Sequence, residues 1–211
     1  HNPKVAGSNP APATVTEGGP GHGPGPSSFP GSVYRLVYRH LGRRAGTRTV
    51  RSPVGPCRST GPDPPASSTA LGDWYANVLF WRRQVALFVN VSTFVPVLMP
   101  LAPSAGVVGR FPAAMAEVFA TLGIDPRFVA METAEMRSAV LAKTARRQVL
   151  GVMNEFTFMA EHTISTCRSD PGDLVGLSVW LANTIVGPIS RDDGSTPVGA
   201  LRNRVAAALD R

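Results

Sequence analysis

The pattern of hydrophobic and polar positions changes near residue 70, because apolar residues recur at the spacings of strands and helices only after it. Two β-rich runs, WYANVLF (74–80) and VALFVNV (85–91), flank the segment WRRQ. They predict a hairpin over 74–91, with Arg82 and Arg83 solvated at its turn. The run SAVLAKT (138–144) predicts a further strand, although its alanines also suit a helix.

Five later segments have the apolar spacing of amphipathic helices, namely 112–123, 125–136, 146–164, 173–185 and 195–210. The predicted helix ends are Pro112 in a first turn, Gly123 at a C′ position, Asp125 and Asp173 as N-caps, and Ser195 or Thr196 capping ahead of Pro197. The predicted inner stripes are Val149, Val152, Met153, Phe156 and Met159 in one helix and Val198, Leu201, Val205 and Leu209 in another. Gly151 weakens its helix, and a glycine there often allows close backbone approach.

Strands and helices do not alternate regularly along the chain, which favours an α+β fold over a doubly wound sheet. We predict a small antiparallel sheet, made of hairpin 74–91 and a strand near 138–144, covered by four to five helices. The expected organisation is a single domain over 66–211 behind a disordered leader over 1–65. Within the leader, SVYRLVYR (32–39) nearly alternates and is compatible with one edge strand.

The segment between Gln84 and Gly109 has no charged residue and is long enough for a membrane helix. Its prolines and polar residues argue against that, because lipid offers no partner for the backbone groups that proline frees. We therefore expect a buried strand followed by an irregular apolar segment, and no membrane partner.

The leader differs from the rest in composition and charge. Residues 1–70 contain 11 Gly and 12 Pro, a content typical of low-complexity sequence, with 8 basic and 2 acidic residues. Residues 71–211 contain 13 basic and 12 acidic residues, so the formal charge of +7 comes almost wholly from the leader. Arginine and tyrosine in 34–51 suit nucleic-acid contacts, but nucleic acid is not an expected partner of the nearly neutral folded domain.

The opening segment KVAGSNPAPAT (4–14) resembles the conceptual translation of the 3′ half of a transfer RNA gene, and we interpret it as a gene-calling artefact. Arginine outnumbers lysine 19 to 2, which indicates a GC-rich genome. Cys57 and Cys167 make neither a disulfide framework nor a zinc motif, and the chain has no Gly-rich phosphate loop. We expect a cytoplasmic bacterial protein with no metal and no cofactor.

Two motifs carry a resemblance. LGDWYANVLF (71–80) and VLGVMNEF (149–156), followed by TPVGAL (196–201), resemble an uncharacterised bacterial family of domains of unknown function over about 66–211. Members of that family pair an LGDWYAN segment that opens a hairpin with a later LGxMN segment that opens a helix. The family implies no catalytic residue, cofactor or partner.

The candidate binding residues lie in these two motifs and in the junction before the second, and they are Asp73, Trp74, Tyr75, Asn77, Lys143, Arg146, Asn154 and Glu155. If the two groups meet, the cations and the helix N-terminus suit an anion, and the aromatic rings suit stacking. The structural alternative is that Asp73 caps a turn, Trp74 fills core and Asn154 satisfies backbone.

Two functional classes follow from these candidates. One is a binding or interaction module with a protein partner or an anionic ligand. The other is a small enzyme acting on a phosphate-bearing or nucleic-acid substrate, with Lys143 and Arg146 as electrostatic groups and Asp73 or Glu155 as acid/base. His162 shares a helix face with Glu155 but stands two turns away, too far for a direct hydrogen bond. Convergence of the candidates in one pocket would favour the enzyme.

Overall fold

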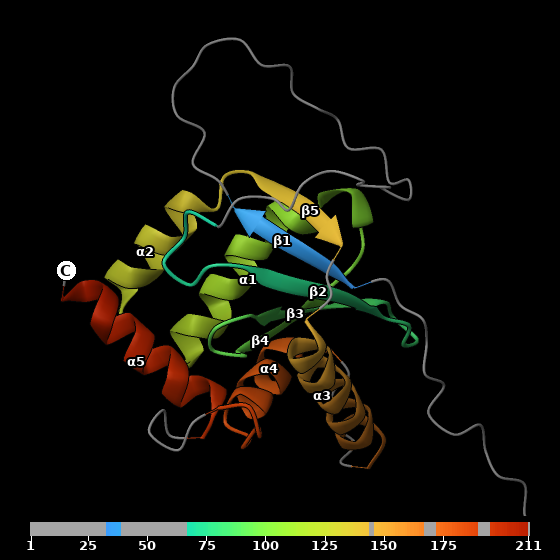
Figure 1. The fold of residues 1–211 in the computed structure, drawn as a ribbon. Helices are drawn as coiled ribbons and strands as arrows, with labels where there is room; N and C mark the ends of the chain where they lie inside the picture. Colours follow the sequence, from blue (N-terminus) through green and yellow to red (C-terminus); the bar gives the residue numbers. More distant parts are fainter. Residues whose placement is uncertain (1–32, 39–66, 144–145, 167–171, 190–194, 211) are drawn as a thin grey trace, which may run out of the picture.

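In a computed structural model of the chain, the structure describes residues 33–38, 67–143, 146–166, 172–189 and 195–210. Within these residues, five strands form one antiparallel sheet in the order β4-β3-β2-β1-β5 (Figure 1). The strands are β1 (Tyr34–Tyr38), β2 (Trp74–Leu79), β3 (Val85–Asn90), β4 (Pro96–Pro100) and β5 (Ala139–Lys143). The helices are α1 (Val107–Thr121), α2 (Pro126–Glu135), α3 (Arg147–Thr166), α4 (Leu174–Ala182) and α5 (Pro197–Leu209). The predicted α+β class is confirmed.

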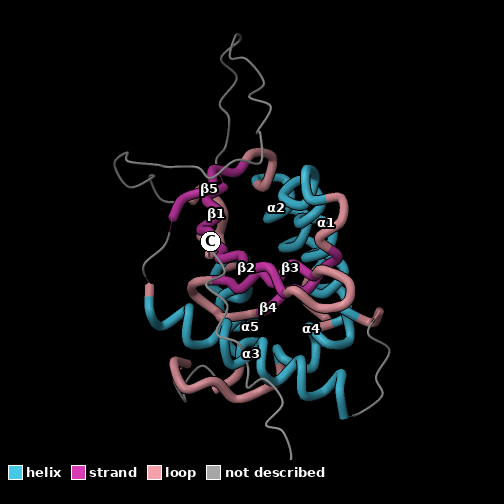
Figure 2. The backbone as a smooth tube through the Cα atoms, turned by 90° about the vertical axis from the view of Figure 1, so that its right-hand side faces the viewer, coloured by secondary structure: helices cyan, strands magenta, loops and turns pink. Residues whose placement is uncertain are grey.

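Helices cover both faces of the sheet, and Figure 2 shows strands lying between α1 and α2 on one side and α3 on the other. Successive residues of β3 enter two different hydrophobic clusters, because side chains alternate across a strand. Phe88 packs with α1 and α5 residues, while Leu87 and Val89 pack with α3 and α4 residues. All six residues of β3 are buried, so this strand is the centre of the core.

Strand β1 comes from the segment that we predicted to be a leader. It pairs with β2 on one side and β5 on the other, so the predicted edge position is wrong. Leu36, Val37 and Tyr38 are at most 1% exposed, which shows that the near-alternating pattern reflects a strand covered on both faces. The predicted boundary at residue 66 therefore leaves out one strand of the sheet. The rest of the leader lies outside the described residues.

Strand β4 replaces the irregular apolar segment that we predicted after β3. Its prolines fit because the backbone nitrogens of residues 96, 98 and 100 point away from β3, and an edge strand tolerates proline there. The remaining outward amide, Leu98 N, donates to Ser178 Oγ of α4 over 2.8 Å. Helix α4 thereby covers the β4 edge and protects it from pairing with another chain.

The predicted helices are present, with differences at their ends. Gly123 has φ +71°, Asp125, Asp173 and Thr196 accept N-cap hydrogen bonds, and Pro197 opens α5. Helix α1 begins at Val107 rather than near Pro112, because Val107 and Val108 pack on the core and extend the helix, which leaves Pro112 inside it. Leu209 is 38% exposed and does not belong to the inner stripe of α5. Among the described residues, none of the helices has the length and apolar content to cross a membrane.

Candidate functional site

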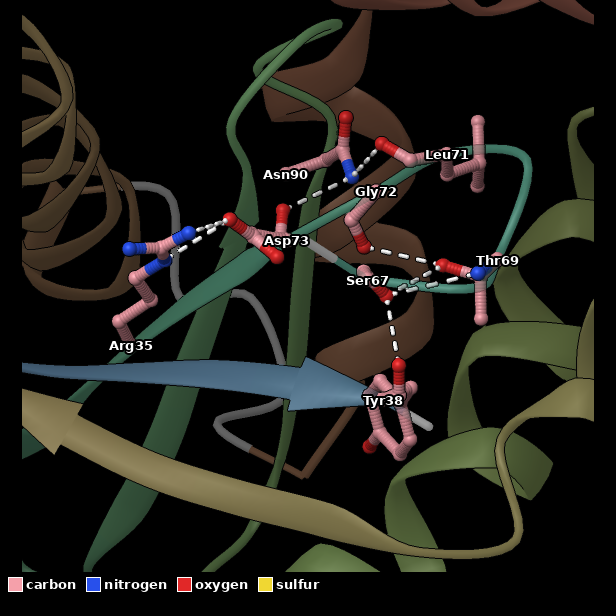
Figure 3. A network of polar contacts seen from close by, with 8 residues as sticks. All are labelled: Arg35, Tyr38, Ser67, Thr69, Leu71, Gly72, Asp73 and Asn90. Carbon is pink, nitrogen blue, oxygen red and sulfur yellow. Dashed lines mark hydrogen bonds and ion pairs between the residues drawn. The ribbon is translucent and has the colours of Figure 1, made fainter. Parts of the chain in front are cut away.

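The turn that opens β2 is held by backbone geometry and by one buried amide side chain. Gly72 has φ +78°, in the left-handed region that favours glycine. Asn90 Nδ2 donates to Leu71 O over 3.1 Å and to Asp73 O over 3.2 Å (Figure 3). On its other side, Asn90 Oδ1 accepts from the backbone amides of Ser92 and Thr93, each over 3.0 Å. Asn90 therefore locks the entry of β2 to the turn that follows β3.

The carboxylate of Asp73 pairs with an arginine of the neighbouring strand. Arg35 Nε donates to Asp73 Oδ2 over 2.8 Å, and Figure 3 shows the two side chains pointing toward one another from β1 and the start of β2. The side chains are 22% and 15% exposed, so the ion pair is partly desolvated. The sequence did not suggest Arg35 as the partner of Asp73. This ion pair links β1 to the start of β2.

The aromatic residues of the motif belong to the core. Trp74 is fully buried and packs edge-on against Phe111, with ring centroids 4.9 Å apart. Tyr75 is 2% exposed and packs in the cluster under α3 and α4. Neither ring offers an exposed face for a stacked base, so the structural alternative holds for Trp74. Asn77 is half-buried, and its Oδ1 accepts from the adjacent Val78 amide over 2.9 Å.

A buried glutamate holds the loop before the motif. Glu132 of α2 is 1% exposed, and its carboxylate accepts from Ala70 N over 2.9 Å and from Leu71 N over 3.2 Å. Burial raises the pKa of Glu132, and the hydrogen bonds from Leu71 and Ala70 oppose that rise. Arg204 of α5 donates to Ala70 O over 3.1 Å, so two helices clamp this loop. Each of these polar groups stabilises the fold.

The remaining candidates lie on or next to α3. Arg146, Asn154 and Glu155 are exposed, and the side chain of Lys143 lies outside what the structure describes. No described contact brings Asp73 or Asn77 to the candidates on α3. The convergence that would favour the enzyme is therefore not seen among the described residues.

The outer face of α3 is the exposed stripe formed by Arg147, Gln148, Gly151, Asn154, Glu155, Phe158, Glu161 and His162. Its opposite face packs on the sheet through Val149, Val152, Met153 and Phe156, as predicted, while Met159 is only half-buried. Phe158 is 61% exposed, although a phenyl ring is normally buried. At the far end, Trp81 Nε1 donates to Glu161 Oε1 over 3.1 Å and fixes α3 to the β2–β3 turn.

A shallow hollow of about 360 Å³ lies elsewhere, between β4, α1 and the start of α4. Its charged lining residues are Glu117 and Asp173, and Asp173 is already engaged as the N-cap of α4, accepting from Gly176 N over 2.7 Å. None of the eight predicted site residues lines it. Within the described part of the chain, no three His, Cys, Asp or Glu residues are placed to hold a metal ion.

Comparison with known families adds one match. The model of a domain of unknown function, DUF6933, matches residues 47–198. The chain belongs to the DUF6933 family. The match includes both motifs of the resemblance and confirms that the chain belongs to a family of unknown function, while β1 lies before its first residue. No curated protein and no solved structure shows a significant match to this DUF6933 chain.

Sequence reasoning missed the partners of the residues in the LGDWYAN segment. Arg35, Asn90, Glu132 and Arg204 make long-range polar contacts with the motif segment (residues 67–77), and they lie 17 to 134 residues from their partners. A usable signal was Glu132, which lies at helical spacing between the buried apolar residues Phe128 and Met136. Of the residues weighed for acid/base or thiol chemistry, His162 is exposed on α3 and Cys167 lies outside the described residues.

Proposed function

We propose that this protein is a non-catalytic interaction module that binds another protein through the outer face of α3. The single observation that carries the proposal is Phe158, which is 61% exposed in the middle of a helix whose other face is fully used by the core. A large aromatic ring on a rigid helix is a common anchor at protein interfaces. Asn154 and Glu155, two of the predicted binding residues, lie on the same stripe.

The motif segment supports this division of roles. Asp73, Trp74 and Tyr75 are engaged by Arg35 and by the core, so they contribute to positioning the sheet under α3. Tyr75 packs in the same cluster as Val152 and Phe156 of α3. The motif segment therefore helps to position α3, the proposed binding helix, on the sheet.

The test is differential capture with the full chain as immobilised bait. Three baits are compared, namely the unaltered chain, Phe158→Ser and Met131→Ser. Met131 is 43% exposed on α2 and serves as a matched control for the loss of an exposed apolar side chain. We expect proteins retained by the unaltered chain and by Met131→Ser to be lost from Phe158→Ser. Equal retention by all three baits would contradict the proposal.

A second part of the proposal concerns the origin and location of the protein, and it rests on the sequence. We propose a bacterial cytoplasmic protein whose residues 4–14 derive from a translated transfer RNA gene. The nucleotide sequence that encodes residues 1–14 and the DNA before it tests this origin. A complete transfer RNA gene overlapping that region is the expected result, and its absence would make the opening residues a true part of the protein.

A further inference from the structure

The outer face of α3 combines a protruding ring with a position that has no side chain. Phe158 protrudes, and Gly151 lies two helical turns earlier on the same stripe. A Cβ placed on Gly151 would meet nothing within 4 Å, so the fold of the chain itself does not require glycine there. Glycine weakens a helix relative to alanine, and its lack of a side chain allows another backbone or ring to approach closely.

We infer that two copies of this chain associate through an antiparallel α3 pair in which Phe158 of each copy seats on Gly151 of the other. The inference rests on the proposed function and names a second copy as the occupant of the α3 face. In a two-fold symmetric pair, one contact between positions 151 and 158 generates a second one. The axis then passes between Asn154 and Glu155, at the midpoint of these two positions. The outer face of α3 in each copy therefore supplies both Phe158 and Gly151 to the two symmetric contacts.

The charges at the ends of α3 complement one another in this arrangement. At 100° per residue, Arg147 and Glu161 lie on the same side of the stripe, fourteen residues apart. Across the axis, Arg147 of one copy approaches Glu161 of the second copy, and the pair forms twice. Glu161 already accepts from Trp81 through one oxygen, and a carboxylate has further acceptor sites.

Glu155 gives the arrangement a distinctive weakness. It lies on the opposite side of the stripe and close to the two-fold axis, so the Glu155 carboxylates of the two copies face each other. Repulsion between these two negative charges opposes association. Removing this charge is therefore expected to tighten the dimer, whereas at most other interfaces a substitution weakens binding.

One helix pair buries less surface than a standard interface, so the dissociation constant is expected to be roughly 1–100 µM. Sedimentation velocity of the full chain over this range gives the constant, and thermal unfolding gives the melting temperature. Gly151→Ala is expected to raise the melting temperature by about 2–4 °C while weakening association by about tenfold. Gly109→Ala is the matched control, since Gly109 is an exposed helical glycine of α1 with the same open surroundings.

The remaining variants sharpen the test. Phe158→Ser is expected to abolish association over the same range, and Glu155→Gln to tighten it about threefold to tenfold. A monomer at every concentration up to roughly 1 mM would overturn the inference. It would also be overturned by a dimer that Gly151→Ala leaves intact, or that Glu155→Gln weakens. If the chain is a monomer and the Phe158→Ser bait still fails to retain the captured proteins, this inference is wrong but the proposed function stands.

Discussion

The segment 67–77 and the outer face of α3 both contain predicted binding residues, but they use them in opposite ways. In the first, Asp73 bonds Arg35, Trp74 fills the core, and the loop amides before them bond Glu132. In the second, Asn154, Glu155 and Phe158 are exposed to solvent. The motif segment thus stabilises the fold, and the proposed binding surface lies on α3. Four predictions test this contrast.

Trp74→Ala has the largest expected effect. Removing a fully buried indole leaves a cavity beside Phe111, so the free energy of unfolding should fall by about 3–5 kcal/mol. Trp180→Ala is the matched control, because Trp180 is 43% exposed on α4. Chemical denaturation of both variants measures the difference. A similar loss in the free energy of unfolding for the two variants would contradict a structural role of the motif segment.

Glu132→Ala comes next. The substitution leaves the amides of Ala70 and Leu71 without their acceptor, and unsatisfied buried donors cost about 1–3 kcal/mol each. We expect a loss of about 2–4 kcal/mol in the free energy of unfolding. Glu117→Ala, at an exposed position of α1, should change it by less than about 0.5 kcal/mol. Equal losses in the free energy of unfolding for Glu132→Ala and Glu117→Ala would contradict the role of Glu132 in holding this loop.

The same residue predicts a pH dependence. Because burial raises the pKa of Glu132 above its ordinary value of about 4.5, the folded chain keeps a proton that the unfolded chain has released. This contribution to stability is complete below pH 4.5 and is lost as the pH rises through the raised pKa. Glu132→Gln should remove that slope. The free energy of unfolding of both chains, measured from roughly pH 4 to pH 8, tests this, and identical slopes would contradict the prediction.

Phe158→Ser has the smallest expected effect on stability. The ring is exposed, so the free energy of unfolding should change by less than about 0.5 kcal/mol. Phe156→Ser, two residues earlier on the buried face, should cost about 3 kcal/mol or more. Denaturation curves of the pair would contradict the account if Phe158→Ser approached the cost of Phe156→Ser, because the ring would then belong to the core.

The sequence was most informative where structure is set by near neighbours. Helix spacing predicted the buried face of α3, and the caps at Asp125, Asp173 and Thr196 follow from residues within a few positions. Pairings over long separations were not predictable. Arg35 finds Asp73 across 38 residues, and β1 takes its place inside the sheet through pairing with β5, more than 100 residues later.

The candidate site was only partly predictable for the same reason. Trp74 was predicted either to stack on a ligand or to fill the core. Its burial shows that it fills the core, and a sequence motif does not show burial. Strand β4 was missed because its prolines are acceptable only when their side of the strand faces away from β3. The sequence predicts Gly151 to be a weak point of its helix, but it does not show that the exposed Phe158 lies on the same stripe.

The central claim is that α3, and not the motif segment, is where this protein meets another protein. Site-specific photo-crosslinking in cells tests it most directly, with a photoreactive phenylalanine analogue placed either at Phe158 or at Phe80. Phe80 is 57% exposed at the end of the motif strand, so the two sites are matched in residue type and exposure. We predict a discrete crosslinked product from position 158 and none from position 80. A product from position 80 alone would contradict the account.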